Sequence, residues 1–139
     1  MEGTDEEMHT RKITLIRKGP AARASVREFE LIVDEIPEKD GTNKGPRPTE
    51  YLLISLAGCY SNAFLRIAQK RKLDVKEVKC EITGHVNKKR MDKIDFILKV
   101  VGSPTMEQLN TIKKLADSAC TIKNSLNSEV KVSIERLNP

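Results

Sequence analysis

The sequence predicts an α+β fold in a single domain, residues 1–139, because paired strands are interrupted by helices. Two observations carry this prediction. Apolar residues alternate with polar ones in several short segments, and they recur at three- and four-residue steps in two longer segments. A chain of 139 residues is long enough to bury one core. The expected element order is β-β-α-β-β-α-β, with no internal repeat and no domain linker.

The N-terminal region is expected to form a hairpin within residues 10–36. Residues 1–9 are mostly acidic and polar, so they predict a flexible tail rather than a secretory signal. Residues 11–17 are β-branched and apolar, and residues 27–36 alternate, so each segment predicts a strand. Residues 37–48 contain two glycines and three prolines, which is typical of an irregular loop that could cover a site.

The clearest helix is expected within residues 48–72, with Pro48 in its first turn. A helix this apolar in a small protein should be central and covered on several sides. Its apolar positions, which recur at helical spacing, are Leu52, Leu53, Leu56, Cys59, Tyr60, Ala63, Phe64 and Ile67.

Residues 75–137 are expected to form the C-terminal αβ part. Residues 78–86 and 94–100 alternate and, with a turn at residues 87–90, they predict an antiparallel hairpin. The residues expected to point inward are Val78, Cys80, Ile82, Gly84, Val86, Ile94, Phe96, Leu98 and Val100.

A second helix is expected after Ser103, which would cap it, with Pro104 at its first position. Residues 121–126 predict a short helical continuation, and residues 129–137 predict a last strand. The apolar stripe of the second helix is expected at Leu109, Ile112, Leu115, Ala116 and Ala119, and the inward residues of the last strand at Val130, Val132 and Ile134.

Charge and composition exclude several classes of partner. The net charge is +5, but 25 basic residues are scattered among 20 acidic ones, and aromatic residues make up only 4% of the chain. Without base-stacking residues or a recognised motif, we expect no nucleic-acid partner. No apolar run approaches the roughly 20 residues that span a bilayer, so we expect no membrane partner. Three cysteines and no export signal favour reduced thiols in the cytoplasm.

The three cysteines differ in their surroundings. Cys80 lies on the apolar face of an alternating strand and is interpreted as a small buried residue. Cys59 lies in the middle of the first helix among small neighbours, so it is either a core residue or a thiol that another group can approach. Cys120 lies where one helical stretch gives way to another, and a thiol at a helix start gains thiolate character from the free N–H groups. With only His9 and His85, the spacings match no metal site.

Two segments resemble the OsmC/Ohr family of osmotically inducible and organic hydroperoxide resistance proteins. Residues 48–59 (PTEYLLISLAGC) resemble the segment that opens the family's central helix, and residues 116–126 (ADSACTIKNSL) resemble its second-cysteine segment. The order of strands and helices agrees, so the resemblance covers residues 11–137. It implies an intertwined homodimer in which the two central helices pack inside and antiparallel sheets wrap around them.

The resemblance also implies an activity, that of a cysteine-based, thiol-dependent peroxidase with an antioxidant role in the oxidative stress response. Cys59 would attack an organic hydroperoxide and become a sulfenic acid, and Cys120 would condense with it to form a disulfide. An external dithiol would then reduce the pair. No metal or organic cofactor is implied.

The family places an arginine from the N-terminal hairpin beside its first cysteine, and Arg17 best matches that position, with Arg23 and Arg27 near enough to compete. Such a cation would favour the thiolate and stabilise the leaving alkoxide. Glu50 is the candidate for the carboxylate that orients the arginine.

Two positions depart from the family pattern. The family's glutamate usually follows the proline directly, where this chain has Thr49, and Glu50 is one residue later, about 100° further around the helix. Thr121 follows the second cysteine where the family often has proline. A second hypothesis therefore stays open, a non-catalytic OsmC-like binding protein that holds an acyl or other apolar small molecule in the dimer groove. Leu53, Leu56, Tyr60 and Phe64 could line such an apolar site, although core packing is the main role expected of them.

Overall fold

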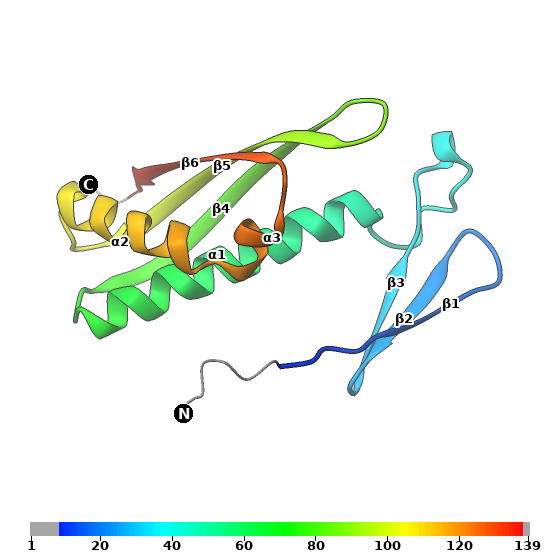
Figure 1. Ribbon diagram of the computed structural model, residues 1–139, viewed down its shortest axis with the longest axis horizontal. Coiled ribbons are helices and arrows are strands. Elements are labelled where there is room, and N and C mark those ends of the chain that lie inside the picture. Colours follow the sequence, from blue (N-terminus) through cyan, green and yellow to red (C-terminus); the bar gives the residue numbers. More distant parts are fainter. Residues whose placement is uncertain (1–8, 138–139) are drawn as a thin grey trace. The chain divides into compact units, whose positions relative to one another are not determined.

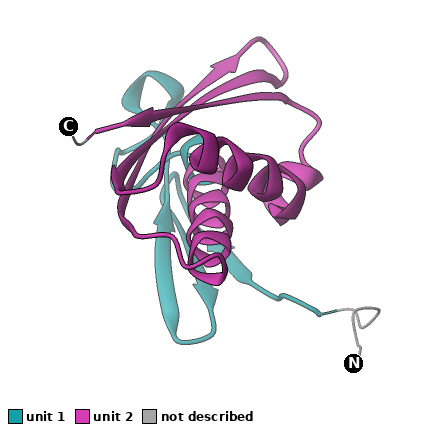
Figure 2. Cartoon of the chain, turned by 90° about the vertical axis from the view of Figure 1, so that its left-hand side faces the viewer, with its two compact units in different colours: residues 1–51 teal, residues 52–139 magenta. Residues whose placement is uncertain are grey.

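The computed structural model describes residues 9–137, which form three helices, one 3-10 turn and two three-stranded sheets (Figure 1). The predicted α+β class is confirmed. The chain divides into two compact units, residues 1–51 and residues 52–139 (Figure 2). The expected tail at residues 1–9 lies outside the described residues except for His9, which is exposed.

The first unit contains an antiparallel sheet in the order β1 (Thr14–Arg17), β2 (Ala22–Val26) and β3 (Phe29–Val33). The sequence predicted a hairpin of two strands here, and β2 was missed. Its sequence, ARASV, offers little β-branched or aromatic signal. Arg27 has a φ of 50°, the left-handed conformation that a two-residue hairpin turn requires, and so it joins β2 to β3 directly.

This sheet has one apolar face with large exposed side chains. Leu15, Ala24 and Leu31 are register neighbours, so their side chains share one face. Leu15 is 45% exposed, Leu31 is 42% exposed and Phe29, on the same face, is 50% exposed. The opposite face is mixed, because Arg23, Ser25 and Glu30 share it with Ile16, which is 59% exposed. On the apolar face Ala22 is fully buried, but Leu15, Phe29 and Leu31 are left partly open to solvent.

The loop after β3 is organised around the carboxylate of Asp34, which is only 2% exposed. Its oxygens accept hydrogen bonds from the Thr42 hydroxyl (2.5 Å) and from the backbone N–H groups of Thr42 (3.1 Å), Lys44 (2.9 Å) and Glu35 (2.7 Å). These donors hold the pKa of Asp34 well below its usual range. The only regular structure in the loop is a single turn, η1 (Pro37–Lys39), as the proline and glycine content indicated.

The second unit contains most of α1 (Pro48–Lys70), followed by β4 (Val75–Val86), β5 (Met91–Gly102), α2 (Met106–Ala119), α3 (Thr121–Ser125) and β6 (Glu129–Arg136). Strands β4 and β5 form the predicted antiparallel hairpin. Strand β6, however, pairs with β5 in parallel. The chain returns to the sheet through α2 and α3, and such a crossover brings a strand back in the same direction.

The core of the second unit lies between the sheet and the two longer helices, which Figure 1 shows on one side of it. The predicted inward residues of β5 are confirmed, because Ile94, Phe96, Leu98 and Val100 are at most 1% exposed. The predicted stripe of α2 is correct only in part, since Leu115 and Ala119 are exposed. The buried residues that α1 and α2 contribute are Leu56, Tyr60, Ala63, Phe64, Ala68, Leu109, Ile112 and Ala116.

The start of α2 differs from the prediction by two residues. Thr105, not Ser103, is the N-cap, and it forms a capping box with Gln108. The Gln108 N–H donates to the Thr105 hydroxyl (3.1 Å), and the Thr105 N–H donates to the Gln108 side chain (2.9 Å). A threonine followed three residues later by glutamine satisfies two helix-end N–H groups at once, which a serine at position 103 would not.

Helix α1 is long and apolar enough, by length and composition alone, to cross a membrane. The expectation that no segment approaches this length was therefore wrong. The same composition suits a core helix, and one face of α1 carries five buried residues that pack into the core of the second unit.

Asp34→Asn should lower the urea midpoint of unfolding near pH 7, because an amide NH₂ cannot accept the bonds from Thr42 and Lys44. The folded-state pKa of Asp34 is depressed, so its stabilisation is complete above the ordinary carboxyl pKa and is lost as the pH falls below that value. The difference in urea midpoint between wild type and Asp34→Asn should thus become smaller at about pH 3. Asp40→Asn, an exposed carboxylate of the same loop, is the control, and equal midpoint losses in both variants would contradict this account.

Candidate thiol site

The fold brings Cys59 and Cys120 together, although they are far apart in the sequence. Cys59 lies in the middle of α1 and Cys120 lies between α2 and α3, and both belong to the second unit. Their side chains are within hydrogen-bonding reach of each other, and both thiols are free. Cys59 is half-buried at the edge of the core, whereas Cys120 is fully buried. The arrangement therefore pairs an accessible thiol with a protected one.

Cys120 is both the C-cap of α2 and the N-cap of α3. Its sulfur accepts a hydrogen bond from the Lys123 N–H at 3.5 Å. Burial raises the pKa of Cys120, and a neighbouring Cys59 thiolate raises it further, while the N–H groups of Lys123 and Ile122 partly oppose both effects. Cys120 is therefore held in its protonated form by its surroundings.

The neighbours of Cys59 along α1 are small. Gly58 is exposed, and a Cβ atom added there would meet nothing within 4 Å. Ala57 and Ser61 are half-buried, as is Cys59 itself. No bulky side chain therefore adjoins Cys59 on its N-terminal side.

A partly buried polar network lies beside the two thiols, and the sequence analysis missed it. Tyr60 is fully buried, and its hydroxyl donates to Asp117 Oδ1 at 2.7 Å. The other carboxylate oxygen of Asp117 accepts a hydrogen bond from Lys113 Nζ at 3.0 Å. Burial and the Asp117 carboxylate raise the pKa of Tyr60 well above its usual range, so the phenol stays protonated. The available signal was a tyrosine on an apolar stripe, because a buried tyrosine needs a polar partner.

Cys80 lies on β4 opposite Leu98 of β5 and packs against the core, as predicted. Burial raises the pKa of its thiol, which keeps it protonated and unreactive. It therefore serves as an internal comparison for the other two cysteines.

The three candidate arginines all belong to the first unit, and each has a local partner. Arg17 donates to the carbonyl oxygen of Pro20 at 2.6 Å, and Arg23 pairs with Glu30 at 3.2 Å. The Arg27 guanidinium lies 4.9 Å from the centre of the Phe29 ring. Because Cys59 belongs to the second unit, the assignment of Arg17 to the thiol stays a prediction.

Arg17 is nevertheless distinguished from Arg23 by its place in the sheet. Alternation along β1 puts Arg17 on the same face as Leu15, which is the apolar face. Arg23 lies on the opposite face with Glu30. The two arginines are therefore separated by the sheet.

Glu50 acts at the start of α1. Its Oε1 atom accepts a hydrogen bond from the backbone N–H of Arg47 at 2.8 Å, which satisfies a donor at the helix start. The Arg47 side chain pairs with Glu35 at 2.7 Å, a contact that the sequence analysis missed. Glu50 thus has a helix-capping role in this chain, and its expected role of orienting Arg17 stays a prediction.

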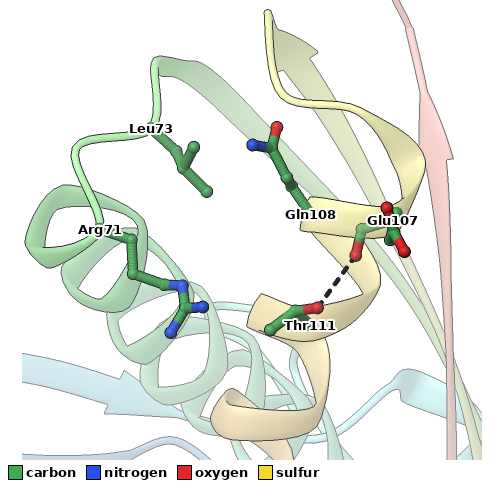
Figure 3. A pocket seen from close by; sticks show the side chains of 5 residues that line it. All are labelled: Arg71, Leu73, Glu107, Gln108 and Thr111. Carbon is green, nitrogen blue, oxygen red and sulfur yellow. Dashed lines mark hydrogen bonds between the residues drawn. The ribbon is translucent and has the colours of Figure 1, made fainter.

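A cavity of about 430 Å³ lies away from the thiols, where the end of α1 approaches the start of α2 (Figure 3). Two of its polar side chains are engaged, since Thr111 donates to the Glu107 carbonyl (3.1 Å) and Gln108 belongs to the capping box. Within residues 9–137, no three His, Cys, Asp or Glu side chains form a group that could hold a metal ion.

Comparison with solved structures shows which proteins share this fold. An OsmC-like protein of unknown function from Vibrio cholerae is 22% identical with a TM-score of 0.84, and the match covers 92% of this chain and 100% of that one. An OsmC-like protein from Mycoplasma pneumoniae is 16% identical with a TM-score of 0.85, covering 94% and 99%. An organic hydroperoxide resistance protein from Legionella pneumophila is 16% identical with a TM-score of 0.71, covering 93% and 98%.

No curated protein sequence matches this chain. The family model described as OsmC-like protein, however, matches residues 41–135, which include both cysteines of the thiol site and the whole of α1, β4, β5 and α2. The match spans most of the chain and agrees with the resemblance found in its two cysteine segments. The chain therefore belongs to the OsmC-like protein family.

Proposed function

We propose that this protein is a cysteine-based, thiol-dependent peroxidase that reduces organic hydroperoxides through the Cys59/Cys120 pair. The observation that carries the proposal is the contact between a half-buried thiol and a buried one in the same unit. A protein of the same fold from Legionella pneumophila is called an organic hydroperoxide resistance protein, which supports the substrate class.

The chemistry follows from the different surroundings of the two thiols. The Cys59 thiolate attacks the hydroperoxide, so that the O–O bond breaks, an S–O bond forms and the alcohol leaves after taking a proton. Cys120, still protonated, then displaces water from the Cys59 sulfenic acid and forms a disulfide. An external dithiol restores both thiols by exchange and is itself oxidised. Such a reductant suits a cytoplasmic location.

The proposal includes a homodimer, as the family resemblance implies. The apolar face of the sheet β1-β2-β3 leaves Leu15, Phe29 and Leu31 between 42% and 50% exposed, and Ile54 on α1 is 57% exposed. Exposed apolar areas on this scale favour association. A second copy of the chain that covers this sheet face would contact Arg17 there. The dimer would therefore include the arginine that is proposed to assist Cys59.

One observation favours the alternative of a non-catalytic protein that binds an acyl or other apolar molecule. The Glu50 carboxylate accepts from the Arg47 N–H, and the Arg47 side chain pairs with Glu35, so among residues 9–137 no carboxylate bonds to the Arg17 guanidinium. Binding of a fatty acid without consumption of hydroperoxide would support this second function.

Cys59→Ser should abolish cumene hydroperoxide consumption with a lipoyl dithiol as reductant, because the nucleophile is lost. Cys120→Ser should still consume one equivalent per chain but form no intramolecular disulfide. Cys80→Ser, the matched control, should keep wild-type activity, since burial keeps that thiol protonated. Loss of hydroperoxide is followed by a colorimetric assay. Wild-type protein no faster than Cys59→Ser would exclude the peroxidase.

Arg17→Met should slow the reaction of Cys59 with hydroperoxide by about 10²-fold, because the leaving alkoxide loses its cationic partner. Arg23→Met removes an equal charge from the opposite face of the same sheet and should leave the rate unchanged. Stopped-flow oxidation of the reduced protein measures both rates. A slower oxidation rate in Arg23→Met, with an unchanged rate in Arg17→Met, would show that Arg23 and not Arg17 assists Cys59.

Leu31→Glu should convert a dimer into a monomer in sedimentation-velocity experiments, because a carboxylate on the apolar sheet face cannot be buried without a partner. Glu30→Gln, a change at the neighbouring residue on the opposite face, should leave the dimer intact. Circular dichroism of both variants verifies that they fold. A monomeric wild-type protein at micromolar concentration would contradict the proposed assembly.

A further inference from the structure

We propose that Tyr60 and Asp117 are positioning residues, whose hydrogen bond across α1 and α2 holds Cys59 and Cys120 at the separation from which they form a disulfide. This inference rests on the redox pair of the proposed function and assigns it two further residues. Neither residue needs to touch the hydroperoxide.

The network lies directly beside the thiols on both helices. Tyr60 follows Cys59 in the sequence, and Asp117 lies one turn before Cys120. The hydrogen bond between Tyr60 and Asp117 measures 2.7 Å and joins the helix of one thiol to the helix that leads to the other. No comparable polar link between α1 and α2 is found elsewhere in residues 9–137 apart from the weaker contact of the same Tyr60 hydroxyl with the Lys113 carbonyl, at 3.3 Å.

Both ends of this link are themselves fixed. The Tyr60 ring packs on Phe96 of β5 with its centre 5.0 Å away, so the ring has little freedom. The Asp117 carboxylate is held through its second oxygen by Lys113, at 3.0 Å. A hydrogen bond between two constrained groups sets a distance, whereas the surrounding aliphatic contacts of α1 and α2 are non-directional and tolerate small shifts of one helix along the other.

Disulfide formation is sensitive to such shifts. The Cβ atoms of a disulfide are about 3.8 Å apart and its dihedral angle is restricted, so a small displacement of either helix removes the pair from the reactive geometry. In the second chemical step the Cys120 sulfur forms a bond to the Cys59 sulfur, the S–O bond of the sulfenic acid breaks, and the Cys120 proton leaves with the hydroxyl as water. The first step involves Cys59 alone and should not depend on the network.

The test measures these two steps separately in Tyr60→Phe, which deletes one hydroxyl and keeps the ring on Phe96. All proteins carry Cys80→Ser so that only two thiols remain. The rate of hydroperoxide attack should equal that of the parent, while the disulfide should form about tenfold more slowly, with more sulfenic acid trapped by dimedone. Asp117→Asn, which keeps a hydrogen-bond acceptor, should recover most of the parent rate, and Asp117→Ala should not.

A second readout needs no peroxide. In glutathione buffers of fixed composition, the ratio of disulfide to dithiol should fall about tenfold in Tyr60→Phe, because the thiols lose effective concentration for each other. Ile112→Val truncates a buried residue of α2, the helix of Asp117, and serves as the control for a general loss of stability. Its ratio should stay at the parent value.

The outcomes are distinct. A parent-like ratio in Tyr60→Phe would overturn the inference, and so would equal falls in Tyr60→Phe and Ile112→Val, which would reduce the network to a stabilising contact. The parent protein could fail to consume hydroperoxide while Tyr60→Phe still lowers the disulfide-to-dithiol ratio in glutathione buffers. This result would exclude the proposed peroxidase and still support the positioning role.

Discussion

The contact that Tyr60 makes between α1 and α2 is the constraint on which the thiol site depends. Its hydroxyl donates to Asp117 of α2 at 2.7 Å, and its ring packs on Phe96 of β5. Ala63 on α1 and Ala116 on α2 are small and buried in the same core, where larger side chains would not fit. The Tyr60 contact keeps the helix of Cys59 beside the helix that ends at Cys120.

Burial also distinguishes Cys59 from Cys120. A fully buried thiol is held protonated, while a half-buried one beside it remains open to solvent and to reactants. The same physical effect keeps Tyr60 protonated, so that it can only donate to Asp117. The two thiols thus differ in their surroundings although the side chains are chemically identical.

The sequence was informative wherever local periodicity was strong. Alternation located β4 and β5 and the inward face of β5, and helical spacing located α1 and the buried part of α2. On β4 the predicted inward face failed at Val86, which is 58% exposed because the register shifts between His85 and Val86. It missed β2, where two alanines and two polar residues carry little strand signal. It also missed the parallel pairing of β6, because the direction of a strand depends on the crossover that precedes it and not on its own residues. Both cysteines were recognised by family resemblance, but the Tyr60–Asp117 contact joins residues that no local pattern relates.

The shared position of Cys120 between two helices affects how the chain can respond to oxidation. Its N–H closes α2 by bonding to the Ala116 carbonyl at 3.0 Å, and its carbonyl opens α3 by accepting from the Asn124 N–H at 3.0 Å. A cysteine inside a continuous helix could move its backbone only by breaking the helical ladder. At this break, a shift of the sulfur can instead be absorbed by rotating the five-residue α3, which leaves the longer helix undisturbed. Oxidation of Cys120 would therefore move α3 before it moves α2.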